Sequence, residues 1–365
     1  MRSFFVRSWL LREVLSLPAA MLRFLSGGGV VHVSGQTLDA QLQFLWRAWF
    51  NTTPGHTPLG LTGRDLGDVR EEWREASRLM APQGLRVRYE PIGGDAASAT
   101  FGLAPINGLL IRPNDTAPDA ALMVFFHQGG GALGASELSR AFAAVFAERA
   151  RCPVFLPDYR LSPENRFPAA FEDAKLAFDW AQANAVRMGA ASGKVAIGGA
   201  LIGANLAARL TMDLRRDFKP LPVAQLLLTP LIDLADPRIR SDAGLGLWPL
   251  TSADIELMIA NYAGAGVELS DPRISPALEP MLVGLPRALV VSAGLDPLAF
   301  QGEAFVHRLL AARARAVYRR YDGLPLGFDL FPGVIDTAAE ATRDIAATWL
   351  DMLRSLPSAA EDEAA

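Results

Sequence analysis

The sequence predicts an α/β fold with a mostly parallel central sheet and helices on both faces. Two observations support this prediction: strand-like segments alternate with helical periodicity from residue 85 onward, and the strand-like run at 194–197 turns abruptly into a helical pattern at 204–214. Strands that alternate with helices form parallel sheets, because each crossover helix covers one face of the sheet. At 365 residues the chain is long enough for one such domain with an addition.

The chain divides into a helical leader and a main domain. Residues 1–84 carry helical periodicity without strand-like alternation, which predicts an N-terminal helical cap. The main domain is expected over 85–357; its excursion 235–285, punctuated by Pro and Asp, is long enough to be a lid. The acidic tail 358–365 is expected to be disordered. The predicted strands are 85–92, 107–113, 121–126, 154–159, 194–199, 223–231, 287–298 and 316–324, and the predicted helices are 136–151, 168–188, 203–217, 301–314 and 336–354.

The composition is that of an ordinary globular enzyme and argues against a nucleic-acid partner. Charged residues make up 20% of the chain, and the formal net charge is -4. The single cysteine, Cys152, is expected to be a buried apolar residue rather than a reactive thiol. Charges interrupt the apolar stretch 1–25 before it reaches the roughly 20 residues of a membrane span. We therefore predict an amphipathic helix there, with contact with a membrane surface as the weaker alternative, and take the cytoplasm as the default location.

The segment GGALIGANL at 198–206 carries the most specific pattern in the chain. It lies where a predicted strand meets a predicted helix. Its spacing, Gly199-x-Leu201-x-Gly203, is that of the G-x-S-x-G nucleophile elbow, with Leu201 in the place of the serine. The sequence therefore predicts the frame of a nucleophilic site without its reactive atom.

Further segments resemble one family, the hormone-sensitive-lipase-like bacterial esterases. FFHQGGGALG at 125–134 resembles the glycine loop of that family, and DYRLSPENRFPAAFEDA at 158–174 resembles its D-Y-R-L-A-P-E segment. SAGLDPL at 292–298 and RRYDGLPLGF at 319–328 resemble its acid strand and its histidine loop. The resemblance covers about 85–350 and implies the α/β-hydrolase fold, with an ancestry among esterases of short or medium acyl chains. No cofactor and no metal ion is expected.

The resemblance implies an oxyanion hole made of backbone N–H groups. These groups belong to Gly129, Gly130 and Ile202. Gln128 stands where the family's motif has its first glycine; this changes the surroundings of the loop but leaves glycines for close backbone approach. For His127 the resemblance implies a role in supporting the loop.

Of the triad that the resemblance implies, only the acid remains, at Asp296. Leu201 stands at the nucleophile position and Leu326 at the histidine position, while Ala200 stands where the family carries aspartate. These changes make the pocket more apolar, which is a pattern that random loss of function does not produce. The sequence does not say whether the pattern arose by natural divergence or by engineering.

No other residue is expected to replace the missing pair. Ser136 and Cys152 lie outside any elbow, and Ser136 is predicted to cap the helix that follows it. His32 and His56 belong to the leader, and His307 lies inside a predicted helix as an ordinary histidine. Without a hydroxyl that attacks and an imidazole that takes its proton, ester hydrolysis is predicted to be lost or very weak.

Two alternatives to an inactive esterase scaffold stay open. Asp296 would face an apolar cavity that raises its pKa, and it would act as a general base, with Gln128 or the oxyanion groups stabilising negative charge. Alternatively, the chain binds a ligand without turnover. The expected ligand is a small apolar molecule or an ester, and the strand 316–324 is expected to form the edge of a homodimer.

Overall fold

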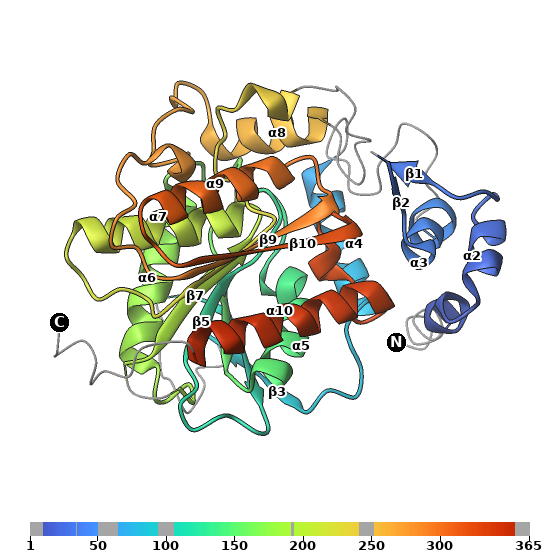
Figure 1. Ribbon diagram of the computed structural model, residues 1–365, viewed down its shortest axis with the longest axis horizontal. Helices are drawn as coiled ribbons and strands as arrows, with labels where there is room; N and C mark the ends of the chain where they lie inside the picture. Colours follow the sequence, from blue (N-terminus) through green and yellow to red (C-terminus); the bar gives the residue numbers. More distant parts are fainter. Residues whose placement is uncertain are drawn as a thin grey trace.

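A single eight-stranded sheet forms the centre of the protein (Figure 1). The computed structural model describes residues 10–33, 35–49, 65–93, 106–190, 193–240 and 252–354. The order across the sheet is β10-β9-β8-β7-β5-β6-β4-β3. Only β4 runs antiparallel to its neighbours, so the predicted mostly parallel sheet is confirmed. The strands are β3 (Val87–Ile92), β4 (Gly108–Pro113), β5 (Leu122–Phe126), β6 (Val154–Pro157), β7 (Val195–Ala200), β8 (Gln225–Leu228), β9 (Ala288–Leu295) and β10 (Ala316–Pro325).

Helices cover both faces of this sheet, which is why its central strands are continuously apolar. Every residue of β5, β6, β7 and β8 is buried. On one face α5 packs against α10, and on the other α6 packs against α7 (Figure 1). The helices of this layer are α5 (Arg140–Ala150), α6 (Ala169–Asn184), α7 (Ile202–Arg216), α9 (Ala299–Ala311) and α10 (Asp336–Arg354).

The N-terminal part is helical, as predicted, but it also contains a small hairpin. Residues 10–15 are helical, and the strands β1 (His32–Val33) and β2 (Gln36–Thr37) pair antiparallel. Strands of two residues are too short to show a period in the sequence, so the pattern missed them. The other elements are α2 (Ala19–Leu25), α3 (Ala40–Phe44), a π-helical turn (Leu45–Trp49) and α4 (Leu66–Leu79).

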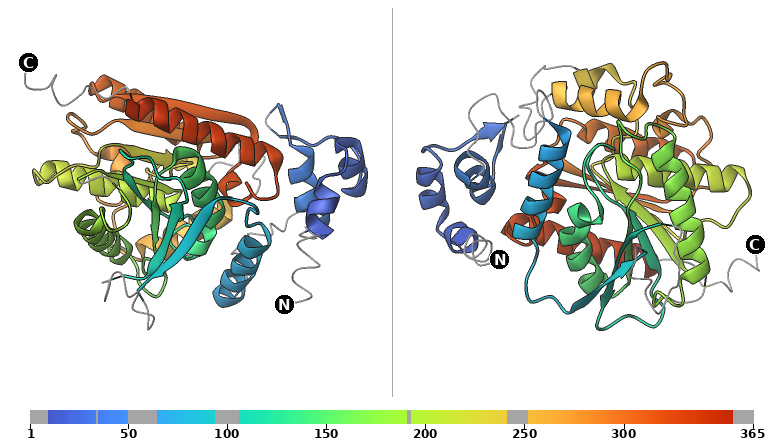
Figure 2. Two further views of the ribbon diagram at one scale, coloured as in Figure 1. Left: turned by 90° about the horizontal axis from the view of Figure 1, so that it is seen from below. Right: turned by 180° about the vertical axis from the view of Figure 1, so that it is seen from behind.

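The N-terminal part lies beside the edge of the sheet that β10 forms and beside α10 (Figure 2), and its side chains bond to β10 and to the segment before α10. Gln36 donates to Asp322 and accepts from the N–H of Gly323. The guanidinium of Arg12 donates to the carbonyl oxygens of Gly333 and Ala81. The leader is therefore held against the main domain by hydrogen bonds to backbone groups as well as by packing.

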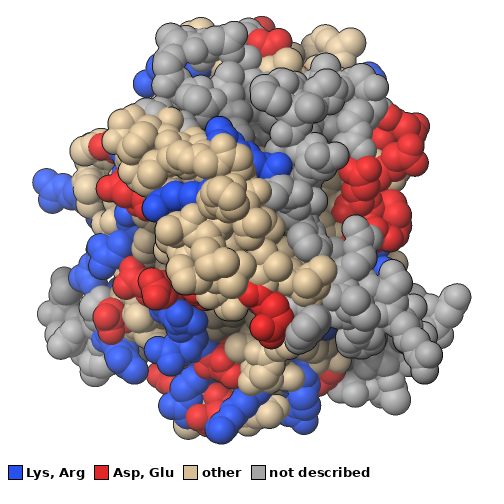
Figure 3. Space-filling view, turned by 90° about the vertical axis from the view of Figure 1, so that its right-hand side faces the viewer, with Lys and Arg blue, Asp and Glu red and all other residues tan. Residues whose placement is uncertain are grey.

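The outer side of the N-terminal part exposes apolar side chains. Met21, Phe24 and Leu25 of α2 are all more than two-fifths exposed. Figure 3 faces this side of the molecule, where uncharged residues form a broad area between charged ones. Among the described residues, no helix has both the length and the apolar character that a membrane span requires. The tail 358–365 lies outside the described residues.

The excursion 235–285 covers the glycine loop with a helix, α8 (Ser252–Ala263). A Cβ atom placed on Gly130 would lie 2.5 Å from Sδ of Met258, and one placed on Gly131 would lie 2.6 Å from the ring of Tyr262. The helix therefore packs directly on the loop. Residues 241–251 of the excursion lie outside the described residues, and its short helical turns are η3 (Pro237–Arg240) and η4 (Pro276–Leu278).

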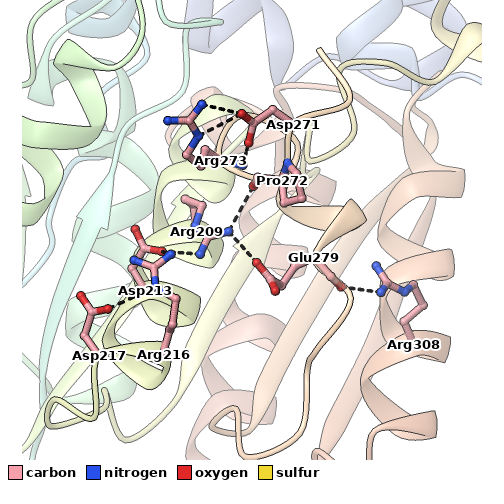
Figure 4. Close-up of polar contacts among 9 residues, drawn as sticks. All are labelled: Arg209, Asp213, Arg216, Asp217, Asp271, Pro272, Arg273, Glu279 and Arg308. Carbon is pink, nitrogen blue, oxygen red and sulfur yellow. Dashed lines mark hydrogen bonds and ion pairs between the residues drawn. The ribbon is translucent and has the colours of Figure 1, made fainter. Parts of the chain in front are cut away.

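A buried arginine ties the end of this excursion to the main domain (Figure 4). Arg209 of α7 is 2% exposed, and its guanidinium donates to Glu279 at 2.8 Å and to the carbonyl oxygen of Pro272 at 3.2 Å. It also pairs with Asp213 one turn along the helix. Arg308 of α9 donates to the backbone oxygen of Glu279 at 2.6 Å. The segment 272–279 is thereby fixed between two helices.

β10 lies at one edge of the sheet, as the predicted dimer contact requires. Within the described part of the chain, β9 is its one strand partner. The homodimer itself stays a prediction.

We expect Arg209→Ala to destabilise the protein by about 3 kcal/mol, because it removes a buried guanidinium whose charge-assisted hydrogen bonds hold two partly buried carboxylates and a carbonyl oxygen. The control is Arg216→Ala, which removes a 59% exposed side chain that pairs with the same Asp213 and should cost less than about 1 kcal/mol. Urea unfolding followed by circular dichroism measures both variants. Equal losses for the two would contradict the anchoring role of Arg209.

Candidate active site

Strand register brings the predicted site residues to one edge of the sheet. Phe126 of β5 pairs with Gly199 of β7, so the residues that follow this pair, His127 and Ala200, emerge next to each other. Leu295 of β9 pairs with Pro325 of β10, so Asp296 and Leu326 likewise end neighbouring strands. The carboxyl edge of a parallel sheet is where open α/β folds place their ligands.

The strand-to-helix turn has the backbone of a nucleophile elbow. Leu201 stands between β7 and α7 with φ 53° and ψ −114°, outside the regions that leucine prefers. A Cβ atom on Gly199 would lie 2.2 Å from the carbonyl of Gly203, and a Cβ on Gly203 would lie 2.1 Å from the backbone oxygen of Phe126. Only glycine fits at both positions. The N–H of Leu201 donates to the backbone oxygen of Leu228 at 3.1 Å, which holds the turn.

The glycine loop follows β5 in a conformation that other residues rarely adopt. Gly129, Gly130 and Gly131 have φ values of 124°, 63° and 75°. The carbonyl of Gly129 accepts from the N–H of Leu133 at 2.8 Å, which closes the loop. Ile202 is the first residue of α7, where backbone N–H groups have no partner inside the helix.

One cavity lies between the elbow, the glycine loop and the helices above them. The centres of water-sized spheres can occupy about 30 Å³ of it, and it opens toward solvent. Leu201 and Leu326 both line it, at 4% and 3% exposed. Among its described lining residues, Gln128 is the one with a polar side chain, apart from the indole of Trp73. The complete lining is Trp73, Gln128, Gly129, Leu133, Leu138, Leu201, Met258, Leu326, Gly327 and Leu330.

Asp296 is buried beside this cavity but is not one of its described lining residues. Its Oδ1 accepts from the N–H of Leu298 at 2.7 Å, and its Oδ2 is buried without a hydrogen-bond partner. Burial raises the pKa of this carboxyl to about 7. The expectation that burial raises its pKa is therefore met, whereas the expectation that it faces the apolar cavity is not supported.

His127 supports the loop in the way the resemblance implies. It is fully buried, and its ring stacks on Tyr159 with centroids 4.1 Å apart. Its Nδ1 lies 2.7 Å from the backbone oxygen of Gln128, so this nitrogen carries the proton. Burial lowers the pKa of the imidazole and keeps it neutral.

A carboxyl that the sequence analysis missed holds Gln128. Asp329, in the turn Phe328–Leu330, is fully buried, and its Oδ2 accepts from Nε2 of Gln128 at 3.0 Å. Its Oδ1 has no partner, and burial raises its pKa to about 7. The signal for it was present, because a lone aspartate interrupts the apolar run GFDLFP at 327–332.

None of the other candidate nucleophiles and bases that the structure describes is among the residues that line the cavity. Cys152 is buried, as predicted, and burial raises the pKa of its thiol to about 12. The predicted capping role of Ser136 is wrong, because Ser136 begins a short 3-10 turn and makes no capping bond, while its N–H donates to Asp158 at 2.6 Å. His32 and His307 are exposed. His56 lies outside the described residues.

The described residues contain no group of three or more His, Cys, Asp or Glu side chains that could hold a metal ion.

Comparison with known proteins finds relatives among the ester hydrolases. A family model described as alpha/beta hydrolase fold matches residues 123–330. The carboxylic ester hydrolase LipN of Mycobacterium tuberculosis is 34% identical over 320 residues, which cover 86% of this chain and 82% of that protein. The arylesterase of Saccharolobus solfataricus is 32% identical over 238 residues, covering 64% of this chain and 75% of the relative.

Solved structures agree with these relatives. The hyperthermophilic esterase of Pyrobaculum calidifontis matches with a TM-score of 0.69 at 31% identity, covering 79% of this chain and 94% of that one. An esterase of the bacterial hormone-sensitive lipase family has a TM-score of 0.68 at 24% identity and covers 84% of this chain, a likeness that concerns the fold. The chain therefore belongs to the alpha/beta hydrolase fold family, as a relative of the hormone-sensitive-lipase-like bacterial esterases.

Proposed function

We propose that this chain binds a small apolar molecule at the former esterase site and does not hydrolyse esters through a serine–histidine pair. One observation carries the proposal: Leu201 at the elbow and Leu326 after β10 line the same cavity. These are the two positions at which the family resemblance places the nucleophile and the base. With a hydrocarbon side chain at both positions, the pair supplies no hydroxyl that attacks an ester carbonyl and no imidazole that accepts the proton of that hydroxyl.

None of the described histidines lines the cavity. The ring of His127 stacks on Tyr159 and its Nδ1 donates to the backbone oxygen of Gln128, while its Nε2 is buried without a partner. In a hydrolase of the serine type, loss of the nucleophile or base leaves a rate enhancement of only roughly 10³–10⁴ over water, which comes from the oxyanion hole and from binding. Turnover at that level is far below that of an esterase.

Packing accounts for the leucine in the strained elbow. A left-handed backbone at a residue with a side chain costs on the order of 1–3 kcal/mol. Full burial of a leucine side chain contributes roughly 1.5–3 kcal/mol, and Leu201 is 4% exposed. The two amounts are similar, so burial in an apolar cavity offsets the strain. In a solvated site the same leucine would not gain this compensation.

The backbone donors of the esterase would still bind a carbonyl oxygen. Gly129 and Gly130 keep the loop conformation, and Ile202 begins α7. The proposed ligand class therefore includes esters held without turnover.

Proton abstraction by Asp296 is the second candidate function. The raised pKa and the unpartnered Oδ2 of this carboxyl favour it. Its position outside the cavity lining opposes it. Since a base must reach the proton that it removes, ligand binding is the better-supported function.

We expect no saturable hydrolysis of p-nitrophenyl acetate or butyrate by the natural sequence. The double variant Leu201→Ser/Leu326→His should raise kcat/KM by at least about a thousandfold, because it restores a hydroxyl and an imidazole beside Asp296. Leu201→Ser alone is the matched control and should stay near the background rate. Saturable hydrolysis by the natural sequence that is lost on changing Ser136 or Cys152 would sink the proposal.

The size of residue 326 should control ligand binding. We expect Leu326→Ala to bind toluene more tightly than the natural sequence does, because it enlarges the cavity. Leu326→Trp should bind toluene at least tenfold more weakly, because its ring occupies the cavity. Isothermal titration calorimetry measures both, with circular dichroism to confirm folding. Equal affinities in the folded variants would place the ligand elsewhere.

The buried carboxyl of Asp296 should make stability depend on pH. Its pKa is about 7 in the folded protein against an ordinary value of 3.8, so between these values the folded state keeps a proton that the unfolded state has lost. The contribution of this group to stability therefore falls as pH rises from 4 to 7 and stays low above 7. The substitution Asp296→Asn should therefore raise the free energy of unfolding by about 2–3 kcal/mol more at pH 8 than at pH 5.

Urea unfolding at the two pH values tests this, with the exposed Asp119→Asn as control. If Asp296→Asn changes the free energy of unfolding by the same amount at pH 5 and at pH 8, the carboxyl is ionised at both pH values and the prediction is wrong.

A further inference from the structure

We infer that Gln128, held in one orientation by Asp329, selects ligands that carry a hydrogen-bond donor, such as an alcohol or phenol O–H, over apolar ligands of similar size that carry none. This inference rests on the proposed function, because it names the class of molecule that the cavity binds. Gln128 is the specificity-determining residue, and Asp329 is its positioning residue.

The first step concerns the orientation of the Gln128 amide. A glutamine side chain can present either its oxygen or its NH₂ group to a ligand. Here the carboxylate of Asp329 accepts from Nε2 at 3.0 Å. An ionised carboxylate accepts hydrogen bonds and donates none, so Nε2 has to face it. The amide oxygen, Oε1, must then point away from Asp329.

The second step concerns the place of that oxygen. Oε1 of Gln128 lies 3.5 Å from the point at which a Cβ atom of Gly327 would stand, and Gly327 lines the cavity together with Gln128. Within the described part of the chain, no N–H or O–H group of the protein donates to Oε1. The cavity therefore contains one fixed hydrogen-bond acceptor with its lone pairs unused.

The third step concerns the surroundings. Leu133, Leu201 and Leu326 line the same cavity with hydrocarbon. A ligand O–H that enters this environment loses its bonds to water, which costs free energy unless an acceptor replaces them. Oε1 supplies that acceptor. A ligand without a donor leaves Oε1 unused and gains no such bond.

Phenol and toluene are the probes, because they carry the same ring and differ in one group. Titrations at pH 8.5 keep Asp329 ionised, since its pKa is about 7. Each affinity is normalised by the transfer of that compound from water to cyclohexane. On this scale we expect the natural sequence to favour phenol over toluene by about three- to tenfold, as for a single net hydrogen bond.

Two variants test the roles of the pair. Gln128→Met/Asp329→Leu removes both polar groups together, so that neither is left buried alone, and it should abolish the normalised preference for phenol over toluene. Asp329→Asn lets the Gln128 amide take either orientation, so it should weaken this preference. Gln225→Met at the start of β8, another buried glutamine, lies at the end of the sheet opposite the site and should leave the preference unchanged.

The outcomes separate this inference from the proposed function. If toluene does not bind the natural sequence, the proposed function fails. If toluene binds but the natural sequence shows no normalised preference for phenol, the inference alone is overturned, and this comparison needs no variant to fold. An unchanged preference in a folded Asp329→Asn protein would overturn the positioning role of Asp329.

Discussion

The close approach of three backbone segments at the elbow constrains the rest of the site. The end of β5, the end of β7 and the start of α7 meet so closely that neither Gly199 nor Gly203 has room for a Cβ atom. This contact fixes where α7 begins and directs residue 201 to the cavity, whatever side chain it carries. The geometry of the elbow therefore depends on its glycines and not on a serine, which explains how it accommodates a leucine.

Neutral hydrogen bonds, rather than ion pairs, set the electrostatics of this edge of the sheet. Asp296 is held by the N–H of Leu298, and Asp329 is held by the amide of Gln128. One neutral donor replaces only part of the water that a carboxylate loses on burial, so the pKa of each rises to about 7. An imidazole beside Asp296 would offset this cost, and Leu326 does not.

Local patterns predicted the fold, whereas tertiary packing decided the details of the site. The strands and the elbow were predictable, because burial of a strand on both faces produces a continuous apolar run and the elbow requires a fixed spacing of glycines. Both patterns lie within a few consecutive residues. The hairpin β1–β2 was missed because each strand has two residues. The roles of Trp73 and Asp329 depend on segments far away in the chain. Whether Asp296 faced the cavity depended on how its side chain packs, which no sequence pattern encodes.

The cavity divides the control of its ligand between two parts of the structure. Its outer walls come from the leader and the excursion, through Trp73 of α4 and Met258 of α8. Methionine is flexible and has no strong hydrogen-bonding group, so Met258 lets this wall adjust to the size of a ligand, while the indole N–H of Trp73 is buried there without a partner. Gln128 follows a central strand and is fixed by Asp329. The helices over the site thus limit the size of the ligand, whereas the edge of the sheet supplies the acceptor that a ligand O–H meets, so that these two properties can change independently.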